Sequence, residues 1–303
     1  MLTSQVEHLL TRFSASQSRG NANDALATRN ISTPVGSVRI YDSAMDNRST
    51  KPCVILVPDG PNVIEHYDAL IALLTPHLRV VCFDMPGFGF SLPQSNYAHS
   101  LNQGAQAVLG VMDALKIDTA TLAFSCANGF YALRAAQTAP QRITRLVLSQ
   151  TPSLTAMHAW TSRVVPWPLR VPVLGQLAGW LFKRKAARSW YGIALPRSTD
   201  AAPYQEKTLN AFNSGACFCL AGVVQGLARE APASLHGVTT PCTLVWGALD
   251  HSHKYTQPQS FIDCAPQADI VHFADCGHFP DVEQPARYAQ VLLHAIGLPS
   301  ATA

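Results

Sequence analysis

The stretch Ala120-Thr-Leu-Ala-Phe-Ser-Cys-Ala-Asn-Gly129 decides the fold. Its first five residues are apolar or β-branched, which predicts a buried strand. Residues 130–137 follow with the spacing of a helix that closes at Pro140. The chain must turn sharply between strand and helix, so the central residue of the turn is held at the carboxyl end of the strand with a strained backbone. The stretch therefore predicts a strand-turn-helix unit that presents one side chain at the edge of a sheet.

Short apolar segments of the same kind recur along the chain, each followed by a turn residue or a helical pattern. They are residues 53–57, 79–83, 145–149, 242–246 and 270–273. Helical spacing is clearest in residues 67–74 and 104–115. Strands that alternate with helices predict an α/β protein with a mostly parallel, doubly wound sheet. Upstream, residues 27–32 and 36–41 predict an antiparallel start to that sheet, preceded by a short helix near residues 6–13.

The alternation stops between residues 153 and 238, where the chain is rich in Trp, Leu and Ala. This segment predicts an inserted helical cap, so the core domain is expected in two parts, residues 1–152 and 239–303. Packing of helices onto the core is the ordinary explanation for such aromatic residues. Residues 174–185 predict a helix with a basic end. A cap helix with its charged end in solvent is favoured there over a helix that faces phospholipid.

Composition limits the classes of protein that fit. The chain has 303 residues, 48% hydrophobic and only 14% charged, against roughly 25% charged in an average soluble domain. This composition excludes disordered and coiled-coil proteins. The net charge of +3 comes without a long run of like charges, so no nucleic-acid partner is expected. No signal peptide or apolar run of transmembrane length is visible, and a cytoplasmic protein without a transmembrane segment is expected.

The eight cysteines are expected to be mostly reduced, because no secretory signal precedes them. No C-x-x-C pair exists. Cys217 and Cys219 are close in sequence, but no cluster of histidines accompanies them. A metal site is therefore not expected.

The strand-turn-helix unit resembles the nucleophile elbow of the α/β-hydrolase fold, which reads small-x-nucleophile-x-small. Laid on residues 114–129 without gaps, the family pattern places the nucleophile on Cys126, whereas Ser125 would need an inserted residue. Cys126 lies 14 residues before Pro140, a spacing common in the family. Two residues depart from the pattern, since Phe124 and Asn128 stand where small residues are usual. At the start of a helix, the dipole is expected to favour the thiolate of Cys126.

Two further segments resemble the rest of a catalytic triad. Residues 275–285 match the family's Gly-His-x-x-x-x-Glu-x-Pro segment, which makes His278 the candidate base. Residues 244–250 match its strand-Trp-Gly-x-x-Asp turn, which makes Asp250 the acid that orients the base. The chain order nucleophile, acid, base is the one expected of this fold. No role is expected for the neighbouring His251 and His253.

The resemblance also implies an oxyanion hole. One donor is the backbone N–H of Ala127, after the nucleophile. The second is that of Gly60, because residues 58–62 align with the family's His-Gly-x-Pro-Gly loop. Here Pro-Asp replaces the usual His-Gly, a departure expected either to alter the polarity of the loop or to bring Asp59 near the substrate. The residues expected to contact substrate are Asp59, Ser125, Trp160 and Phe218.

A cysteine at the elbow is seen in dienelactone hydrolases, polyhydroxyalkanoate synthases and acyltransferases that move aminoacyl groups between carrier proteins. The resemblance therefore implies an acyl-transfer enzyme with a Cys/His/Asp triad and a covalent acyl-thioester intermediate, acting on carrier-protein or coenzyme A thioesters. No cofactor is expected, although the substrate can carry phosphopantetheine or coenzyme A. A hydrolase of small esters or lactones is the first alternative, and a non-catalytic binding protein of the same fold is the second.

Overall fold

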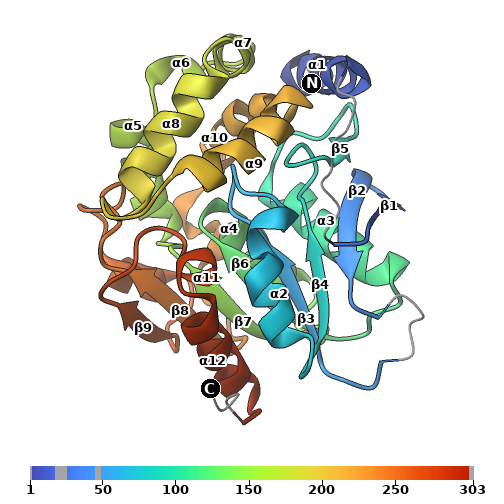
Figure 1. Ribbon diagram of the computed structural model, residues 1–303, viewed down its shortest axis with the longest axis vertical. Helices are drawn as coiled ribbons and strands as arrows, with labels where there is room; N and C mark the ends of the chain where they lie inside the picture. Colours follow the sequence, from blue (N-terminus) through green and yellow to red (C-terminus); the bar gives the residue numbers. More distant parts are fainter. Residues whose placement is uncertain (1, 18–25, 45–48, 300–303) are drawn as a thin grey trace.

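The computed structural model describes residues 2–17, 26–44 and 49–299. Figure 1 shows a central sheet with helices on both faces and a further group of helices above one end of it. The chain begins in α1 (Leu2–Gln17), beside this upper group, and the last helix is α12 (Pro285–Ile296) at the opposite end. The helix expected over residues 6–13 is therefore longer at both ends.

The sheet has the predicted mostly parallel architecture, with an antiparallel start. The strands are β1 (Thr28–Thr33), β2 (Gly36–Asp42), β3 (Cys53–Val57), β4 (Arg79–Phe83), β5 (Leu92–Pro93), β6 (Ala120–Ser125), β7 (Ile143–Ser149), β8 (Cys242–Gly247) and β9 (Asp269–Phe273). Their order is β1-β2-β4-β3-β6-β7-β8-β9, with β5 paired to β2. The pairs that involve β2 are antiparallel and the other pairs are parallel.

Strand β6 lies in the middle of the parallel part, between β3 and β7. All of its residues are buried, as expected of a parallel strand covered on both faces. Phe124 pairs with Val57 and Ser125 with Ser149, so the three strands end at nearly the same level. From β3 the chain goes to β4 on one side and later to β6 on the other. Sites in doubly wound sheets form outside the carboxyl ends of the strands at such a reversal.

Helices cover both faces of this sheet. The core helices other than α1 and α12 are α2 (Asp68–Leu74), α3 (Leu101–Ala114), α4 (Ala127–Thr138) and α11 (Pro280–Glu283), with 3-10 turns η1 (Ile64–Tyr67) and η4 (Pro258–Asp263). One buried apolar cluster contains the inward faces of α3 and α4, and another those of α2 and α12. The helices predicted from spacing are confirmed, and α3 and α4 start three residues earlier than predicted.

The segment between β7 and β8 is helical and lies above the carboxyl ends of the strands (Figure 1). It comprises α5 (Leu154–Val164), α6 (Trp167–Arg170), α7 (Leu174–Leu181), α8 (Lys183–Ala194), α9 (Ala202–Asn213), η2 (Ala216–Phe218), α10 (Cys219–Leu227) and η3 (Pro232–Leu235). Ser153 caps the first of these helices, because its hydroxyl accepts the backbone N–H of Ala156 at 3.2 Å. We call α5 to α10 the cap. None of the helices that the structure describes has the length and hydropathy of a membrane span.

The end of β8 touches the loop that carries His278. A Cβ atom added to Gly247 would lie 1.8 Å from the carbonyl oxygen of Gly277. That atom belongs to the backbone and cannot move aside as a side chain would. The approach of the two segments therefore requires glycine at position 247.

We expect the Gly247→Ala substitution to lower the free energy of unfolding by about 1–3 kcal/mol, as extra atoms forced into a packed interior do. The matched control is Gly192→Ala in α8, where a Cβ meets no atom within 4 Å and alanine favours the helix. Urea denaturation of both variants measures the difference. Equal effects of the two substitutions would contradict the close approach.

Candidate active site

Cys126 occupies the turn between β6 and α4. Its backbone has φ 49° and ψ −120°, a strained conformation for a residue with a side chain. The surrounding backbone fixes the turn: the N–H of Cys126 donates to the carbonyl of Ser149 at 2.7 Å, and its own carbonyl accepts the hydroxyl of Thr151 at 3.0 Å. A Cβ on Gly129 would lie 2.2 Å from that hydroxyl oxygen, so only glycine allows α4 this close. The predicted strand-turn-helix unit is confirmed.

His278 and Asp250 lie next to Cys126. The Nδ1 of His278 is 2.6 Å from the Oδ2 of Asp250, and both side chains are buried. The sulfur of Cys126 lies within 4.8 Å of a ring nitrogen of His278. Asp250 follows β8 and His278 follows β9, whereas Cys126 follows β6. Three loops at the carboxyl edge of the sheet thus bring the three predicted triad residues together.

Asp250 is held by more donors than the sequence suggested. The amide of Gln150 donates to its Oδ2 at 2.7 Å, and the backbone N–H of Ser252 donates to its Oδ1 at 2.8 Å. Burial alone raises the pKa of Asp250, but the neighbouring His278 outweighs it, so the pKa lies below its ordinary value. Sequence reasoning missed Gln150, whose φ of 47° no motif announces. Its place directly after β7 was the available signal.

Asp59 contacts the other nitrogen of the imidazole. Its Oδ2 is 3.2 Å from the Nε2 of His278, and its side chain is buried. The loop is fixed from α4, since the amide of Asn128 donates to the carbonyl of Pro58 at 2.7 Å. Two departures from the family pattern, Pro58 and Asn128, therefore contact each other and hold Asp59 in place. His278 lies between two carboxylates.

Burial and neighbouring charges shift the pKa values of Cys126 and His278. It raises the pKa of Cys126 to about 11, with a further rise from the charge of Asp59. The expectation that the helix start favours the thiolate was therefore wrong for the resting site, because burial and this carboxylate outweigh it. Burial lowers the pKa of His278, yet Asp250 and the other anionic neighbours raise it well above its ordinary value. Burial thus favours the protonated thiol and the carboxylates favour the protonated imidazole, and the thiol must lose its proton before the sulfur can attack.

A cavity of about 860 Å³ opens above the sulfur. Its floor contains Cys126, Asp59 and both residues predicted to form the oxyanion hole, Gly60 and Ala127. Ala127 is the first residue of α4, and the first amides of a helix have no acceptor within it. The walls are apolar side chains of the cap, among them the predicted Trp160.

Ser125 and Phe218, both predicted to contact substrate, do not line this cavity. The hydroxyl of Ser125 donates to the carboxylate of Asp281, beneath the turn. Side chains of successive strand residues point to opposite faces, which is why Ser125 and its neighbour diverge. Phe218 is buried in a separate cluster with Val63 and Phe212.

His253, for which no role was expected, stacks on the imidazole of His278. Its ring lies between that of Trp160, at 5.1 Å and 9°, and that of His278, at 5.4 Å and 23°. Burial lowers its pKa to about 3, so the ring is neutral. Neither ring nitrogen has a hydrogen-bond partner among the described residues. The stacked ring packs against the imidazole of His278.

Cys126, His253 and His278 also form a group whose ligand atoms lie within 4.8 Å of one another. Such a Cys-His-His set is typical of zinc. However, His278 already bonds to a carboxylate through each nitrogen. Its ring and that of His253 stack, so their in-plane lone pairs do not converge on one ion. The arrangement fits a triad better than a metal site. All eight cysteines are free.

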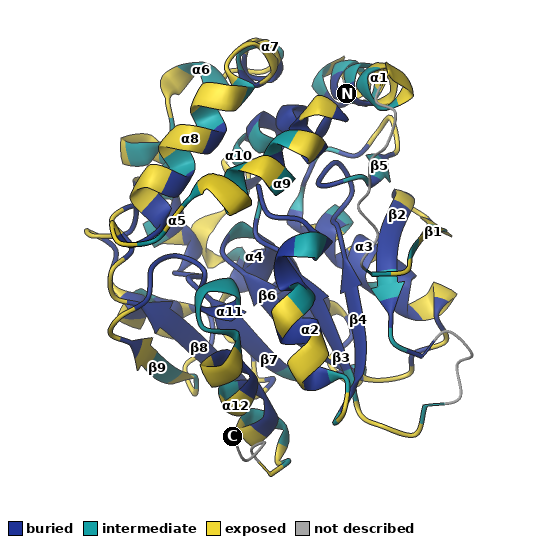
Figure 2. Cartoon of the chain, viewed as in Figure 1, coloured by how far each residue is buried: buried dark blue, intermediate teal, exposed yellow. Residues whose placement is uncertain are grey.

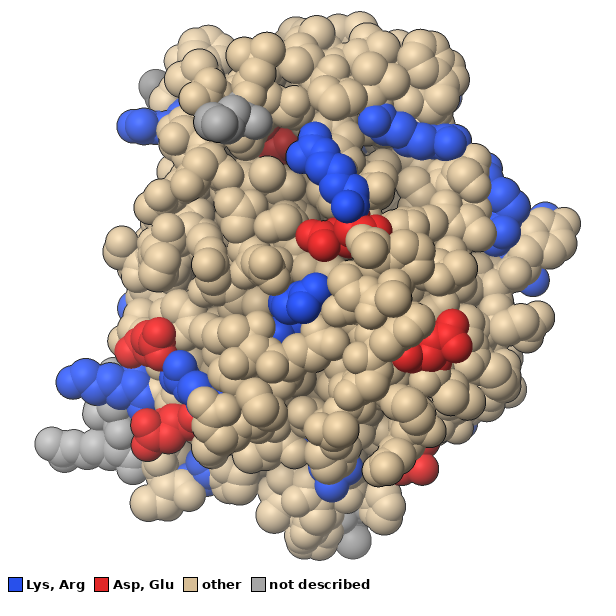
Figure 3. All heavy atoms as spheres, turned by 180° about the vertical axis from the view of Figure 1, so that it is seen from behind, with Lys and Arg blue, Asp and Glu red and all other residues tan. Residues whose placement is uncertain are grey.

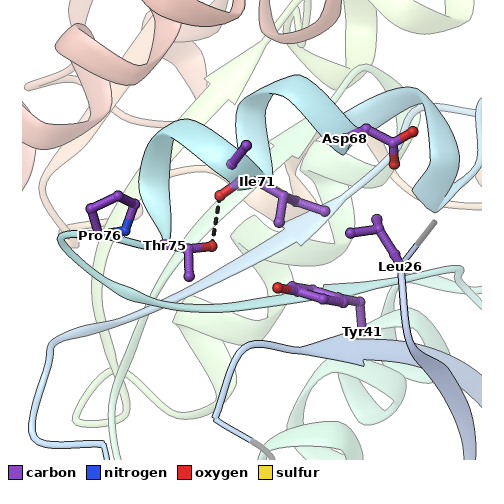
Figure 4. A pocket seen from close by; sticks show the side chains of 7 residues that line it. Leu26, Tyr41, Asp68, Ile71, Thr75 and Pro76 are labelled. Atoms are coloured by element: carbon purple, nitrogen blue, oxygen red, sulfur yellow. Dashed lines mark hydrogen bonds between the residues drawn. The ribbon is translucent and has the colours of Figure 1, made fainter.

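A second hollow, of about 480 Å³, lies away from these residues, between α2 and β2 (Figure 4). Its lining includes Leu26, Tyr41 and Ile71, and the hydroxyl of Thr75 donates to the carbonyl of Ile71 at 2.7 Å. The lining residues contain neither a cysteine nor a histidine. The candidate triad therefore lies at the cavity under the cap and not at this second hollow.

Fold and site together define a hydrolase-type enzyme. Residues 54–291 match the family model described as the alpha/beta hydrolase family, and the chain belongs to this family.

Two curated relatives cover most of the chain. The chain is 28% identical over 229 residues to the pimeloyl-[acyl-carrier protein] methyl ester esterase of Photobacterium profundum, which covers 75% of this chain and 87% of the esterase. It is 23% identical over 257 residues to the 2-hydroxymuconate semialdehyde hydrolase of a Pseudomonas species. The aligned residues cover 82% of this chain and 87% of that hydrolase. The solved structure of the enol-lactonase from Burkholderia xenovorans superposes on this chain with a TM-score of 0.69 at 18% identity. The match covers 89% of this chain and 100% of the lactonase chain, and it shows that the two share a fold.

We expect Asp59→Asn to move the acid limb of the pH profile of kcat/KM to lower pH. The carboxylate of Asp59 raises the pKa of both Cys126 and His278, and activity is lost as pH falls through the raised value. Without the carboxylate, the proton leaves at lower pH. Hydrolysis of an activated ester across pH measures the limb of the free enzyme. Asp68→Asn, on α2 outside the cavity, is the control, and an unmoved limb in Asp59→Asn would contradict the assignment.

Proposed function

We propose that the enzyme transfers acyl groups through a thioester on Cys126. The observation that carries the proposal is the position of this cysteine, at positive φ beside the His278–Asp250 pair on the floor of the cavity. A buried thiol elsewhere in a core has no base beside it and is inert. Here the base, its orienting acid and an opening for substrate are all present.

The reaction then proceeds in two halves. In the first half, Cys126 and His278 together lose one proton. The sulfur of Cys126 then bonds to the carbonyl carbon of the donor thioester, and the carbonyl oxygen becomes an oxyanion that faces the amides of Gly60 and Ala127. His278 gives a proton to the departing thiolate, and the acyl group stays on the cysteine. In the second half, an acceptor thiol or amine attacks this thioester, and His278 takes its proton. The sulfur of Cys126 leaves.

The chemistry of thioesters, the walls of the cavity and the name of a similar protein support the transfer of thioester-bound acyl groups. Exchange between two thioesters changes bond energy little, so a cysteine accepts such a group and releases it to another thiol. The largely apolar walls of the cavity exclude water, the competing acceptor. The similar esterase from Photobacterium profundum is named for a substrate on an acyl-carrier protein. The donor is accordingly a carrier-protein or coenzyme A thioester, no cofactor of the enzyme's own is needed, and the cytoplasm, where such thioesters are made, is its location.

Hydrolysis of small esters or lactones is the second candidate. The two curated relatives described above are named as an esterase and a hydrolase. The same residues serve this reaction when water replaces the acceptor thiol. The two candidates differ only in the fate of the acyl group on Cys126.

Intact-protein mass spectrometry after incubation with a panel of acyl and aminoacyl thioesters tests the proposal. We expect a mass increase of one acyl group on the wild type, and its removal by an acceptor thiol faster than by water. Cys126→Ala should show no increase. Cys53→Ala is the matched control, because Cys53 is half-buried at the start of β3 and remote from the cavity; it should load normally.

Other outcomes would reject the proposed nucleophile or favour one of the two alternative functions. Loading of Cys126→Ala would reject the nucleophile. Release to water that no thiol accelerates would favour the hydrolase. A wild type that never loads, and whose Cys126 reacts with iodoacetamide no faster than an ordinary thiol, would indicate the non-catalytic binding protein.

A further inference from the structure

The cap exposes large apolar side chains on α6, on α7 and at Phe182, which lies between α7 and α8. Trp167 and Leu181 are each 65% exposed, Phe182 is 56% exposed, and Leu177 and Trp180 are 48% exposed. Figure 2 shows α7 and α8 with exposed residues along their outer sides, on the upper edge of the molecule. Monomeric soluble proteins rarely gather this much apolar surface unless it contacts another partner. We call these five residues the apolar patch.

Helix α7 is inverted relative to an ordinary surface helix, whose large apolar residues face the core. Its buried residues are Gly175, Gln176 and Gly179. A Cβ on Gly179 would lie 2.6 Å from the carbonyl oxygen of Cys217, so the small face of the helix is packed tightly against the cap. Leu177 and Trp180 therefore point outward because the inner face has no room for them. The solvent-facing cap helix favoured from the sequence does not explain this arrangement.

The same part of the chain is purely cationic. No Asp or Glu occurs between Asp118 and Asp200. Residues 153–199 contain seven basic residues, Arg163, Arg170, Lys183, Arg184, Lys185, Arg188 and Arg197. Because the whole chain has a net charge of only +3, the remainder is negative. Lys and Arg side chains stand out at the upper right in the view from behind, the side on which the cap lies (Figure 3).

The apolar patch continues into the cavity. All five of its residues line the cavity whose floor is Cys126. An acyl chain that enters between them would pass apolar side chains on its way to the sulfur. The basic residue Lys185 also lines this cavity.

From these observations we infer that the apolar patch and its basic neighbours bind peripherally to an anionic lipid bilayer. Aromatic and aliphatic side chains enter the interface, while Lys and Arg contact the headgroups, as in interfacial amphipathic helices. Binding is peripheral, since no described helix fits a membrane span. An acidic carrier protein would also carry the negative charge that attracts these basic residues. It offers no apolar counterpart, however, for so many exposed aromatic and aliphatic side chains. Membrane binding stands apart from the proposed acyl transfer, and only entry of an acyl chain from the bilayer rests on it.

Vesicle flotation tests the inference on the full chain. We expect the wild type to float with vesicles of phosphatidylglycerol and phosphatidylcholine, and at least tenfold less with phosphatidylcholine alone. Arg184→Glu combined with Arg188→Glu removes two exposed charges outside the cavity lining. It should weaken binding about tenfold or more and leave loading of Cys126 by a short soluble thioester unchanged.

The apolar contribution needs its own pair of variants. Leu181→Ser with Phe182→Ser should also abolish flotation. Leu73→Ser with Ile262→Ser changes two side chains that are 37% and 44% exposed elsewhere, and it should float like the wild type. Unchanged thermal midpoints exclude unfolding as the cause.

Four results would overturn the inference. A wild type that loads acyl groups but never floats would reject membrane binding and leave the proposed function standing. Equal flotation with both vesicle types, or no effect of the arginine reversals, would reject anionic lipid. Binding to a purified acyl-carrier protein that the arginine reversals abolish, without flotation, would assign the surface to a protein partner.

Discussion

The backbone of Cys126, held at positive φ, is the constraint on which the rest of the molecule depends. The turn exists because the carbonyl of Ser149 and the hydroxyl of Thr151 bind its two peptide groups. It also requires the absence of a side chain at Gly129. These contacts connect β6, β7 and α4, so the packing of the sheet itself stabilises the strained residue. In return, the sulfur is fixed at the carboxyl edge, where the loops after β3, β8 and β9 can reach it.

Those loops place charged side chains in a buried site. His278 is bounded by Asp250 at one nitrogen and Asp59 at the other, and aromatic rings cover it. In such surroundings the two carboxylates raise the pKa of the imidazole, while burial raises the pKa of the thiol. Arrival of a substrate that displaces Asp59 from the imidazole would remove one of the charges that hold the proton.

Much of this arrangement was predictable from sequence, for a physical reason. The parallel strands are short apolar runs, and Cys126, Asp250 and His278 each follow a strand within a recognisable turn. Chain order and strand order then place them at one edge. The roles of Gln150 and His253 were missed, because they follow from a backbone angle and a ring stack that form only in the folded chain; for Gln150 the one usable signal was its position directly after β7. The outward face of α7 was missed likewise, since helical periodicity identifies an apolar face without saying on which side the core lies.

The amino-terminal helix is bonded to both the cap and the core. Glu7 of α1 lies 2.5 Å from the Nε2 of His99 in the core, and it accepts the amide of Gln176 in α7 at 3.1 Å. All three side chains are buried. A single carboxylate therefore joins the start of the chain, the sheet domain and the inverted helix, so a displacement of α1 would leave buried polar groups unpaired in the other two. The position of α7, and with it the width of the cavity entrance, is set partly by a residue more than one hundred positions away from Cys126.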